Sequence, residues 1–394
     1  MGNKMSVLKQ IMGGVFAAAL ALPAIAAEPV RGVTDTEILI GTVTDLSGVA
    51  AIQGVNNANA VRLLFDEVNA HGGINGRKIH YIVEDSQYQV PRAVQATNKL
   101  LNKDQVFMTL QDGGTPMNNA TFAMAHEKGT PKLLPLSAAR AMFEPFHHLK
   151  FSQFASYVDQ IRAGVKYFVE QRHKKAICVM YQDTDFGKDV LAGAQLQTEA
   201  MKMTVVGTTA HKPTDTDFSA NLLKLKESHC DLIVLGTIVR DTQQIISQAR
   251  KIGWEVDMVG QTASYDTAIA DAPGGTGEGF YSMTASLYAY PDDPRPAVQD
   301  LQKRYRAKYG IDMNYIGQVG YSAAEIAVDA LKRAGRDLTV ESLVAAMEST
   351  KDFVDVFGTH YSFGSNKHQA TTAAYLAVIK NGRWVPVLDH TLAY

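Results

Sequence analysis

The sequence predicts an α/β fold with two lobes, each built on a parallel sheet that helices cover on both faces. Three observations predict it. Short apolar strands alternate with amphipathic helices along most of the chain. The scheme of strand, polar turn and helix runs to about residue 150 and then starts again. Removal of the first 26 of the 394 residues leaves 368, which is more than one hydrophobic core usually supports.

The N-terminal segment has the pattern of a secretory signal peptide. Lys4 and Lys9 precede an apolar run, and Ala24 and Ala26 are small residues at the −3 and −1 positions of a cleavage site. The apolar run is shorter than the roughly 20 residues that a membrane span needs. We therefore expect residues 1–26 to be removed after Ala26 and the mature protein to be exported and soluble.

Charge and cysteine content exclude several classes of protein. Without Lys4 and Lys9, 36 of the 38 basic residues remain against 40 acidic ones, so nothing favours binding to nucleic acid or to a membrane surface. The two cysteines, Cys178 and Cys230, lie near the starts of two expected strands that could be neighbours. Adjacent parallel strands rarely give the geometry that a disulfide needs, so we expect two buried free thiols, with a disulfide as the alternative.

The stretch FDEVNAHGGINGRKI at 65–79 illustrates the elements of the first half. Val61, Leu64, Phe65 and Val68 form one apolar stripe of a helix, which the glycines after it end. Asn75-Gly76 then predicts a tight turn into a strand. The first half is expected to contain strands at 37–43, 78–85, 106–112 and 131–138, helices at 56–70 and 90–102, and a helix whose first turn holds Pro116.

The second half repeats this plan and then departs from it. The expected elements are helices at 157–171, 187–202, 217–228 and 240–253 and strands at 175–183, 204–211, 231–237 and 257–263. Residues 274–296 are rich in turns, and helices follow at about 295–309, 318–335 and 340–349. A hairpin around Asn381-Gly382 ends the chain. Such a tail predicts that the chain crosses between the lobes more than once.

Catalytic motifs are missing from the sequence. It holds no G-x-S-x-G, H-E-x-x-H or Walker A motif, and His147-His148 fits a polar loop better than a metal site. The glycines of GGTGEG at 274–279 do not follow a strand, so they predict a flexible connection rather than a dinucleotide loop. We therefore expect a protein that is not an enzyme and that needs no cofactor or metal.

The expected strand ends carry small, hydroxyl-bearing and glycine-rich turns, such as 42–47, 112–115, 137–139 and 260–262. In parallel α/β sheets, ligands bind outside the carboxyl ends of the strands. Any one of these turns is an ordinary helix N-cap, but their recurrence in two lobes without catalytic residues favours a binding cleft.

Four segments resemble the type I periplasmic solute-binding proteins of ABC transporters, in the leucine/isoleucine/valine-binding branch. They are ILIGTVTDLSG, FDEVNAHGGINGRKI, YQDTDFGKD and DTDFSANLLKLKESHCDLIVLG, spread along nearly the whole mature chain. The resemblance implies two Rossmann-like lobes joined by a three-crossover hinge, which close on a small ligand. It implies lobe 1 at 27–152 and 283–357 and lobe 2 at 153–282 and 358–394. A periplasmic location, a monomeric state and an inner-membrane ABC permease as partner also follow from it.

The resemblance also implies which residues bind the ligand in the first lobe. Thr115, which Gly114 precedes in the same turn, matches a hydroxyl that binds a ligand carboxylate. Ser137, Ala138 and Ala139 match the loop beside it, which offers backbone and hydroxyl groups.

Apolar walls are implied on both sides of the cleft. Gln53 falls near a wall position of the first lobe. Phe186 matches an aromatic position that is commonly Tyr, so a hydroxyl contact is absent there. Tyr157 and Tyr265 are the other expected walls.

The departure from the amino-acid binders lies at GQTAS. Those proteins place an acidic residue there for the ammonium group of the ligand, whereas this chain has Thr262. An unpaired buried ammonium costs several kcal/mol, so we expect a carboxylate ligand without an α-amino group, such as an aromatic or short aliphatic acid. If the loops align one or two residues differently, Asp266 supplies the charge and an amino acid is the ligand. Amide binding and a role in a sensory system are further alternatives.

Overall fold

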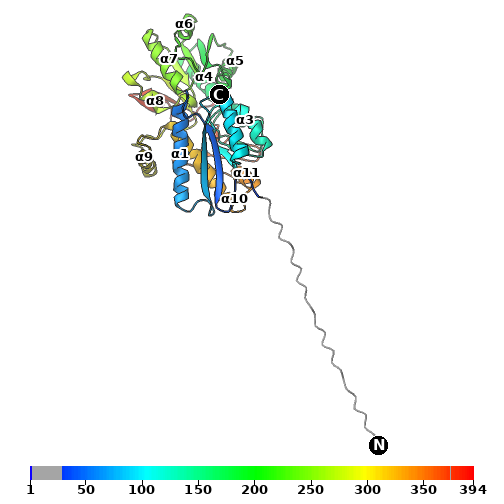
Figure 1. The fold of residues 1–394 in the computed structure, drawn as a ribbon. Coiled ribbons are helices and arrows are strands. Elements are labelled where there is room, and N and C mark those ends of the chain that lie inside the picture. Colours follow the sequence, from blue (N-terminus) through cyan, green and yellow to red (C-terminus); the bar gives the residue numbers. More distant parts are fainter. Residues whose placement is uncertain (2–28, 373) are drawn as a thin grey trace.

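The computed structural model describes Met1, residues 29–372 and residues 374–394. The predicted signal peptide at 1–26 therefore lies, apart from Met1, outside the described residues. The described chain forms two parallel-rich sheets with helices on their faces, which confirms the predicted α/β fold of two lobes (Figure 1).

The first lobe is built on a five-stranded parallel sheet with the order β2-β1-β3-β4-β5. Its strands are β1 (Glu37–Thr44), β2 (Lys78–Asp85), β3 (Met108–Leu110), β4 (Lys132–Leu133) and β5 (Lys150–Phe151). Its helices are α1 (Ala51–Ala70), α2 (Val90–Asn98) with a π-helical end at Lys99–Lys103, α3 (Thr115–Glu127), the 3₁₀ turn Arg140–Met142, α10 (Tyr315–Ala334) and α11 (Val340–Glu348). Helices α1 and α10 pack side by side, although about 260 residues separate them.

The second lobe is built on a seven-stranded sheet with the order β14-β13-β10-β9-β8-β6-β7. Its strands are β6 (Ile177–Gln182), β7 (Gly207–His211), β8 (Leu232–Gly236), β9 (Asp257–Gly260), β10 (Tyr281–Thr284), β13 (Tyr375–Lys380) and β14 (Arg383–Pro386). Its helices are α4 (Tyr157–Arg172), α5 (Asp185–Ala200), α6 (Ser219–Glu227), α7 (Val239–Lys251), α8 (Thr267–Ala270) and the 3₁₀ turns Thr262–Ser264 and Pro273–Gly275. The predicted hairpin at Asn381-Gly382 forms β13 and β14, which join this sheet antiparallel.

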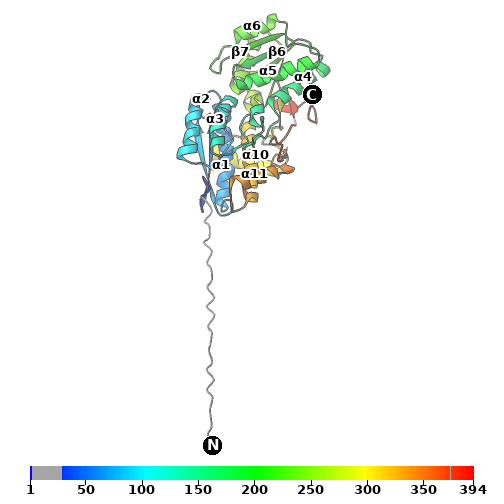
Figure 2. The ribbon, with the colours of Figure 1, turned by 90° about the vertical axis from the view of Figure 1, so that its right-hand side faces the viewer.

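The chain passes between the two sheets three times, as predicted. The crossings lie between β5 and α4, between β10 and helix α9 (Pro296–Tyr309), and between the short hairpin β11 (Phe353–Val354) and β12 (His360–Tyr361) and strand β13. Figure 2 shows α1, α2, α3, α10 and α11 in one lobe and α4, α5 and α6 in the other. The residue boundaries 27–152, 283–357, 153–282 and 358–394 remain predictions.

Helices α1 and α10 begin earlier than the sequence predicts. Helix α1 starts at Ala51 rather than at residue 56, because the carboxylate of Asp45 accepts hydrogen bonds from Ser47, Gly48 and Ala50 and folds the chain into the first turn. Helix α10 starts at Tyr315 rather than 318, where the side chain of Asn314 caps the N–H of Gly317. Apolar periodicity misses both starts because polar side chains determine them.

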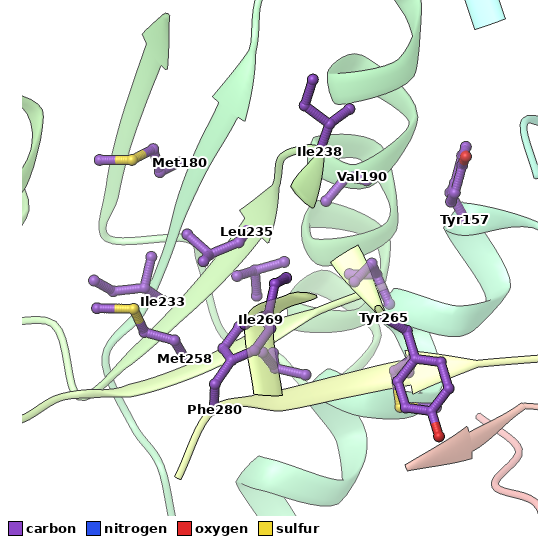
Figure 3. Close-up of a cluster of buried hydrophobic side chains, with 14 of the residues drawn as sticks. Tyr157, Met180, Val190, Ile233, Leu235, Ile238, Met258, Tyr265, Ile269 and Phe280 are labelled. Atoms are coloured by element: carbon purple, nitrogen blue, oxygen red, sulfur yellow. The ribbon is translucent and has the colours of Figure 1, made fainter. Parts of the chain in front are cut away.

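The hydrophobic core of the second lobe packs its sheet against the covering helices, behind the carboxyl ends of the strands. Met180, Ile233, Leu235 and Met258 come from three neighbouring strands and pack with helix residues such as Val190 (Figure 3). All are nearly inaccessible to solvent. Strand β10, within the turn-rich segment, was not predicted; it pairs with β9 through Tyr281 and Ser282.

Cys178 and Cys230 form a disulfide, so the expectation of two free thiols was wrong. The expectation of free thiols assumed that both cysteines lie in paired parallel strands. Cys178 is in β6, opposite Ile233 of β8, whereas Cys230 precedes β8 by two residues, in the loop after α6. His229 adopts a left-handed backbone there (φ 54°), which turns the chain back, and the two Cα atoms lie 5.8 Å apart.

Candidate functional site

A cavity lies between the two lobes, at the carboxyl ends of the strands. Its empty space, about 430 Å³, includes open solvent at the mouth. From the β1–α1 region its lining residues are Thr44, Asp45, Ala50, Gln53 and Gly54. The rest of the first lobe contributes Tyr88, Gly113, Gly114, Thr115 and Leu136. The second lobe contributes Tyr157, Phe186, Ile238 and Ala263.

Five helices direct their N-terminal ends at this cavity. Its lining includes residues of the first turns of α1, α3, α4 and α5 and the residue before α7. A helix N-terminus carries unpaired N–H groups and a partial positive charge, so it favours an anion. The first turns of α4, α5 and α7 each contain an aspartate, Asp159, Asp185 and Asp241, which offsets this charge.

Neither α1 nor α3 has an acidic residue in its first turn, but at α1 the Asp45 carboxylate accepts the N–H of Ala50, so the uncompensated N-terminus is that of α3. Its N-cap residue is Gly114, which has no side chain to accept the first N–H groups and whose φ of 83° suits glycine. Leu136 and Thr115 flank it in the cavity. The end of α3 is therefore the place where the cavity offers most to a negative charge.

A cluster of hydroxyl groups surrounds this helix end. Thr115 Oγ1 lies 2.8 Å from Ser137 Oγ, and Ser137 Oγ accepts the N–H of Ala139 at 3.2 Å. Either hydroxyl can donate in the Thr115–Ser137 bond, and when Ser137 donates, the Thr115 proton can point into the cavity. Tyr157 lies beside them, and burial raises its pKa, so its phenol stays protonated at neutral pH.

The remaining walls are largely apolar. The rings of Tyr157 and Phe186 meet edge to face with centroids 5.0 Å apart, and Ile238 and Leu136 line the cavity near them. Gln53 spans the cavity mouth, because its Nε2 donates to the carbonyl oxygen of Ala263 at 3.1 Å. The cavity thus has one polar, anion-favouring end and an apolar body.

The structure brings together five of the ten predicted ligand-binding residues in this lining: Gln53, Gly114, Thr115, Tyr157 and Phe186. Ser137, Ala138 and Ala139 are buried directly behind it, where Ala138 O accepts the N–H of Tyr157. Thr262 is also set back, since its N–H and hydroxyl both donate to Gln160 Oε1.

Tyr265 is not part of this cavity. Its hydroxyl accepts the N–H of Tyr288, and its ring packs against Tyr315 and Trp384 at the edge of a different crevice by the hinge. Figure 3 shows the side chains of Tyr157 and Tyr265 pointing in different directions. Both tyrosines were expected as apolar walls of one cleft, but the backbone after β9 turns Tyr265 away from this cavity.

Two acidic residues bear on the charge of the ligand. Asp45 lines the cavity, but three backbone N–H groups already occupy its carboxylate. Asp266, the alternative partner for an ammonium group, is fully buried outside the lining and caps α8 through the N–H of Ala268. Burial raises the pKa of Asp266 to about 6.

Sequence reasoning missed Tyr88 and Ile238 as lining residues. Tyr88 follows the carboxyl end of strand β2, and this position could have indicated a lining residue. The prediction considered only turns rich in Thr, Ser and Gly. Lys, Arg and His are all missing from the described lining.

Within 29–372 and 374–394, no group of three or more His, Cys, Asp or Glu side chains suits a metal ion. In the same ranges no helix has the length and apolarity of a transmembrane segment.

A family model described as "Periplasmic binding protein" matches residues 37–383. This chain belongs to that family. Its members are solute-binding proteins of ABC transporters and are not enzymes. The match confirms the predicted family. The chain is 21% identical to the Leu/Ile/Val-binding protein of Citrobacter freundii over 268 residues, 68% of this chain and 73% of that protein.

Solved structures of this family share the fold. A fatty acid ABC transporter substrate-binding protein from Thermomonospora curvata is 27% identical, with a TM-score of 0.83 over 92% of this chain and 93% of that one. A solute-binding protein from R. palustris in complex with benzoate is 19% identical, with a TM-score of 0.79 over 91% of this chain and 97% of that one.

Proposed function

We propose that this solute-binding protein captures a small carboxylic acid without an α-amino group, an aromatic or short aliphatic acid, between its two lobes. The observation that carries the proposal is the polarity of the cavity. The uncompensated N-terminus of α3 and the Thr115 hydroxyl form one end, and the rings of Tyr157 and Phe186 wall the rest. A carboxylate at α3 and an apolar body between the rings match both parts.

The lining argues against an α-amino acid. An ammonium group needs an anionic partner when it is buried. The carboxylate of Asp45 accepts three backbone N–H groups before α1, and Asp266 lies outside the lining. Thr262 offers no charge and donates its hydroxyl proton to Gln160.

Two of the compared structures fit this ligand class. The Thermomonospora curvata protein is named for fatty acids, and the R. palustris protein was solved with benzoate. Both names refer to acids that lack an α-amino group. They support the proposal as examples of what this fold accommodates.

The wider setting is part of the same proposal. The mature protein, cleaved near Ala26, acts as a monomer in the periplasm and delivers its ligand to an inner-membrane ABC permease. Its ligand is a single small molecule, with no nucleic acid partner.

Matched ligands test the proposal on residues 27–394. Isothermal titration compares benzoate with benzamide, hexanoate with hexanamide, and each with leucine. We expect the acids to bind at least tenfold more tightly than their amides, and leucine to bind weakly or not at all. A ligand at about 1,000 times its Kd stabilises the fold by roughly 4 kcal/mol, so melting curves provide an independent readout. Tightest binding by leucine, or equal binding of acids and amides, would overturn the proposal.

A further inference from the structure

The side chain of Tyr88 reaches from the first lobe to the second. Tyr88 lies in the loop between β2 and α2, and its hydroxyl donates to Gln182 Oε1 at 3.2 Å. Gln182 is the last residue of β6 and is fully buried. This hydrogen bond forms only while the two lobes are close together.

The acceptor is held in a fixed orientation. The Gln182 amide donates through Nε2 to Asp241 Oδ2 at 3.4 Å, and Thr184 Oγ1 also donates to its Oε1 at 3.1 Å. The Asp241 carboxylate is in turn paired with Arg240. The amide oxygen therefore faces Tyr88 because its nitrogen is committed to Asp241.

The backbone that presents Tyr88 is unusual. Gln87 and Tyr88 are consecutive non-glycine residues with left-handed conformations, φ 51° and 54°. Hydrogen bonds hold them there: Asp85 Oδ1 accepts the N–H of Gln87 at 2.9 Å, and Ser86 Oγ accepts that of Tyr88 at 3.3 Å. Such conformations cost free energy, and they persist where surrounding contacts impose them, which is frequent at ligand clamps.

The ring of Tyr88 also limits the space beside α3. It lines the cavity, and a Cβ placed on Gly114 would lie 3.2 Å from Tyr88 Cε2. The ring thus packs directly over the glycine that starts α3, at the end of the cavity that favours an anion. A ligand bound at α3 would therefore meet this ring on one side.

We propose that Tyr88 has two roles, as a residue that stabilises the closed form through Gln182 and as the residue that restricts the ligand to short or compact acids. The second role rests on the proposed function, whereas the first does not depend on the identity of the ligand.

An acid series tests the size limit. Dissociation constants for acetate, butyrate, hexanoate, octanoate and benzoate are measured for the wild type, Tyr88→Phe and Tyr88→Ala. Tyr88→Phe keeps the ring and loses one hydrogen bond, so it should weaken every acid about 3- to 10-fold without changing their order. Tyr88→Ala should shift the optimum toward longer acids. An unchanged order in Tyr88→Ala would overturn the size-limiting role.

Closure is measured separately, with no ligand present. Spin labels at Ala123→Cys on α3 and Leu196→Cys on α5, both exposed positions, report the distance between the lobes. Tyr88→Phe should lower the ratio of closed to open molecules about 3- to 10-fold. Tyr309→Phe is the matched control, since that hydroxyl bonds to Asn59 O and does not link the two sheets.

The two measurements separate the possible failures. A closed fraction in Tyr88→Phe equal to that of Tyr309→Phe would overturn the closing role. If no acid binds the wild type, the proposed function and the size limit fall together, and the spin-label result still decides the closing role.

Discussion

The ammonium nitrogen of Lys132 lies 2.5 Å from Oδ2 of Asp112, and both side chains are almost fully buried. Asp112 also accepts hydrogen bonds from Val43 N and Thr109 Oγ1. The pair therefore ties β1, β3 and β4 together directly before Gly113, where the chain enters the cavity. The position of the anion-favouring end depends on this buried pair.

Removing one partner of the pair should be costly. Lys132→Met leaves the Asp112 carboxylate buried without its counter-charge, so we expect a loss of about 3–5 kcal/mol in the free energy of unfolding. Urea denaturation at pH 7 measures it. Lys188→Met is the control, because Lys188 pairs with Asp183 at an exposed site, where such pairs contribute roughly 1 kcal/mol or less. Equal losses in the two variants would contradict this account.

Thr115→Val should weaken acid binding while preserving the fold. The change keeps the shape of the side chain and removes the hydroxyl beside Ser137. A hydrogen bond to a charged group contributes about 1.5–3 kcal/mol, so the Kd for a bound carboxylate should rise roughly 10- to 150-fold. Titration calorimetry measures it, with Thr208→Val, on an exposed face of β7, as the control. An unchanged Kd would exclude Thr115 as a ligand contact.

The disulfide should stabilise the second lobe without affecting the ligand. Cys178 and Cys230 are 52 residues apart, and the chain-entropy model gives about 4 kcal/mol for a loop of this length. We expect the double variant Cys178→Ala/Cys230→Ala to lose stability of this order and to keep its Kd, since neither residue lines the cavity. Reductant should destabilise the wild type and leave the double variant unchanged; sensitivity of the variant to reductant would contradict the assignment.

His126 should make the first lobe sensitive to acid. Its ring stacks on His147 with centroids 3.6 Å apart. Burial, followed by the nearby charges of His147, Lys150, Lys132 and His148, lowers its pKa from 6.5 to about 4. The folded state therefore binds this proton less readily than the unfolded state. The stabilising effect is complete above pH 6.5 and is lost as the pH falls toward 4.

The variant His126→Phe isolates this effect. The urea midpoint of the wild type should fall between pH 7 and pH 4 by more than that of His126→Phe, which cannot take up the proton. The difference between the two proteins at each pH removes the contributions of other groups, such as Asp266. Parallel curves for the two proteins would contradict the prediction.

The sequence was sufficient for the order of most elements, though not for strand β10, and for placing the cleft at the strand ends. Alternating strands and helices, with Gly114 and Thr115 directly after a strand, already indicated an anion site at a helix start. Contacts between segments that are distant in the sequence could not be predicted from it. Tyr88 and Gln182 are 94 residues apart, and nothing local to either predicts their hydrogen bond. Cys230 was misjudged because its place in a loop depends on the turn at His229.

The partial positive charges of the helix N-termini are compensated unevenly between the two lobes. This difference suggests that one lobe captures the ligand and the other retains it. The uncompensated end belongs to α3 in the first lobe, whereas α4, α5 and α7 of the second lobe each carry an aspartate in the first turn. On the proposed function, an acid docks on the first lobe, and the second lobe acts as a cover. Ionic strength should then govern the association rate of the acid. The fit of the second lobe over the ligand should govern its dissociation rate.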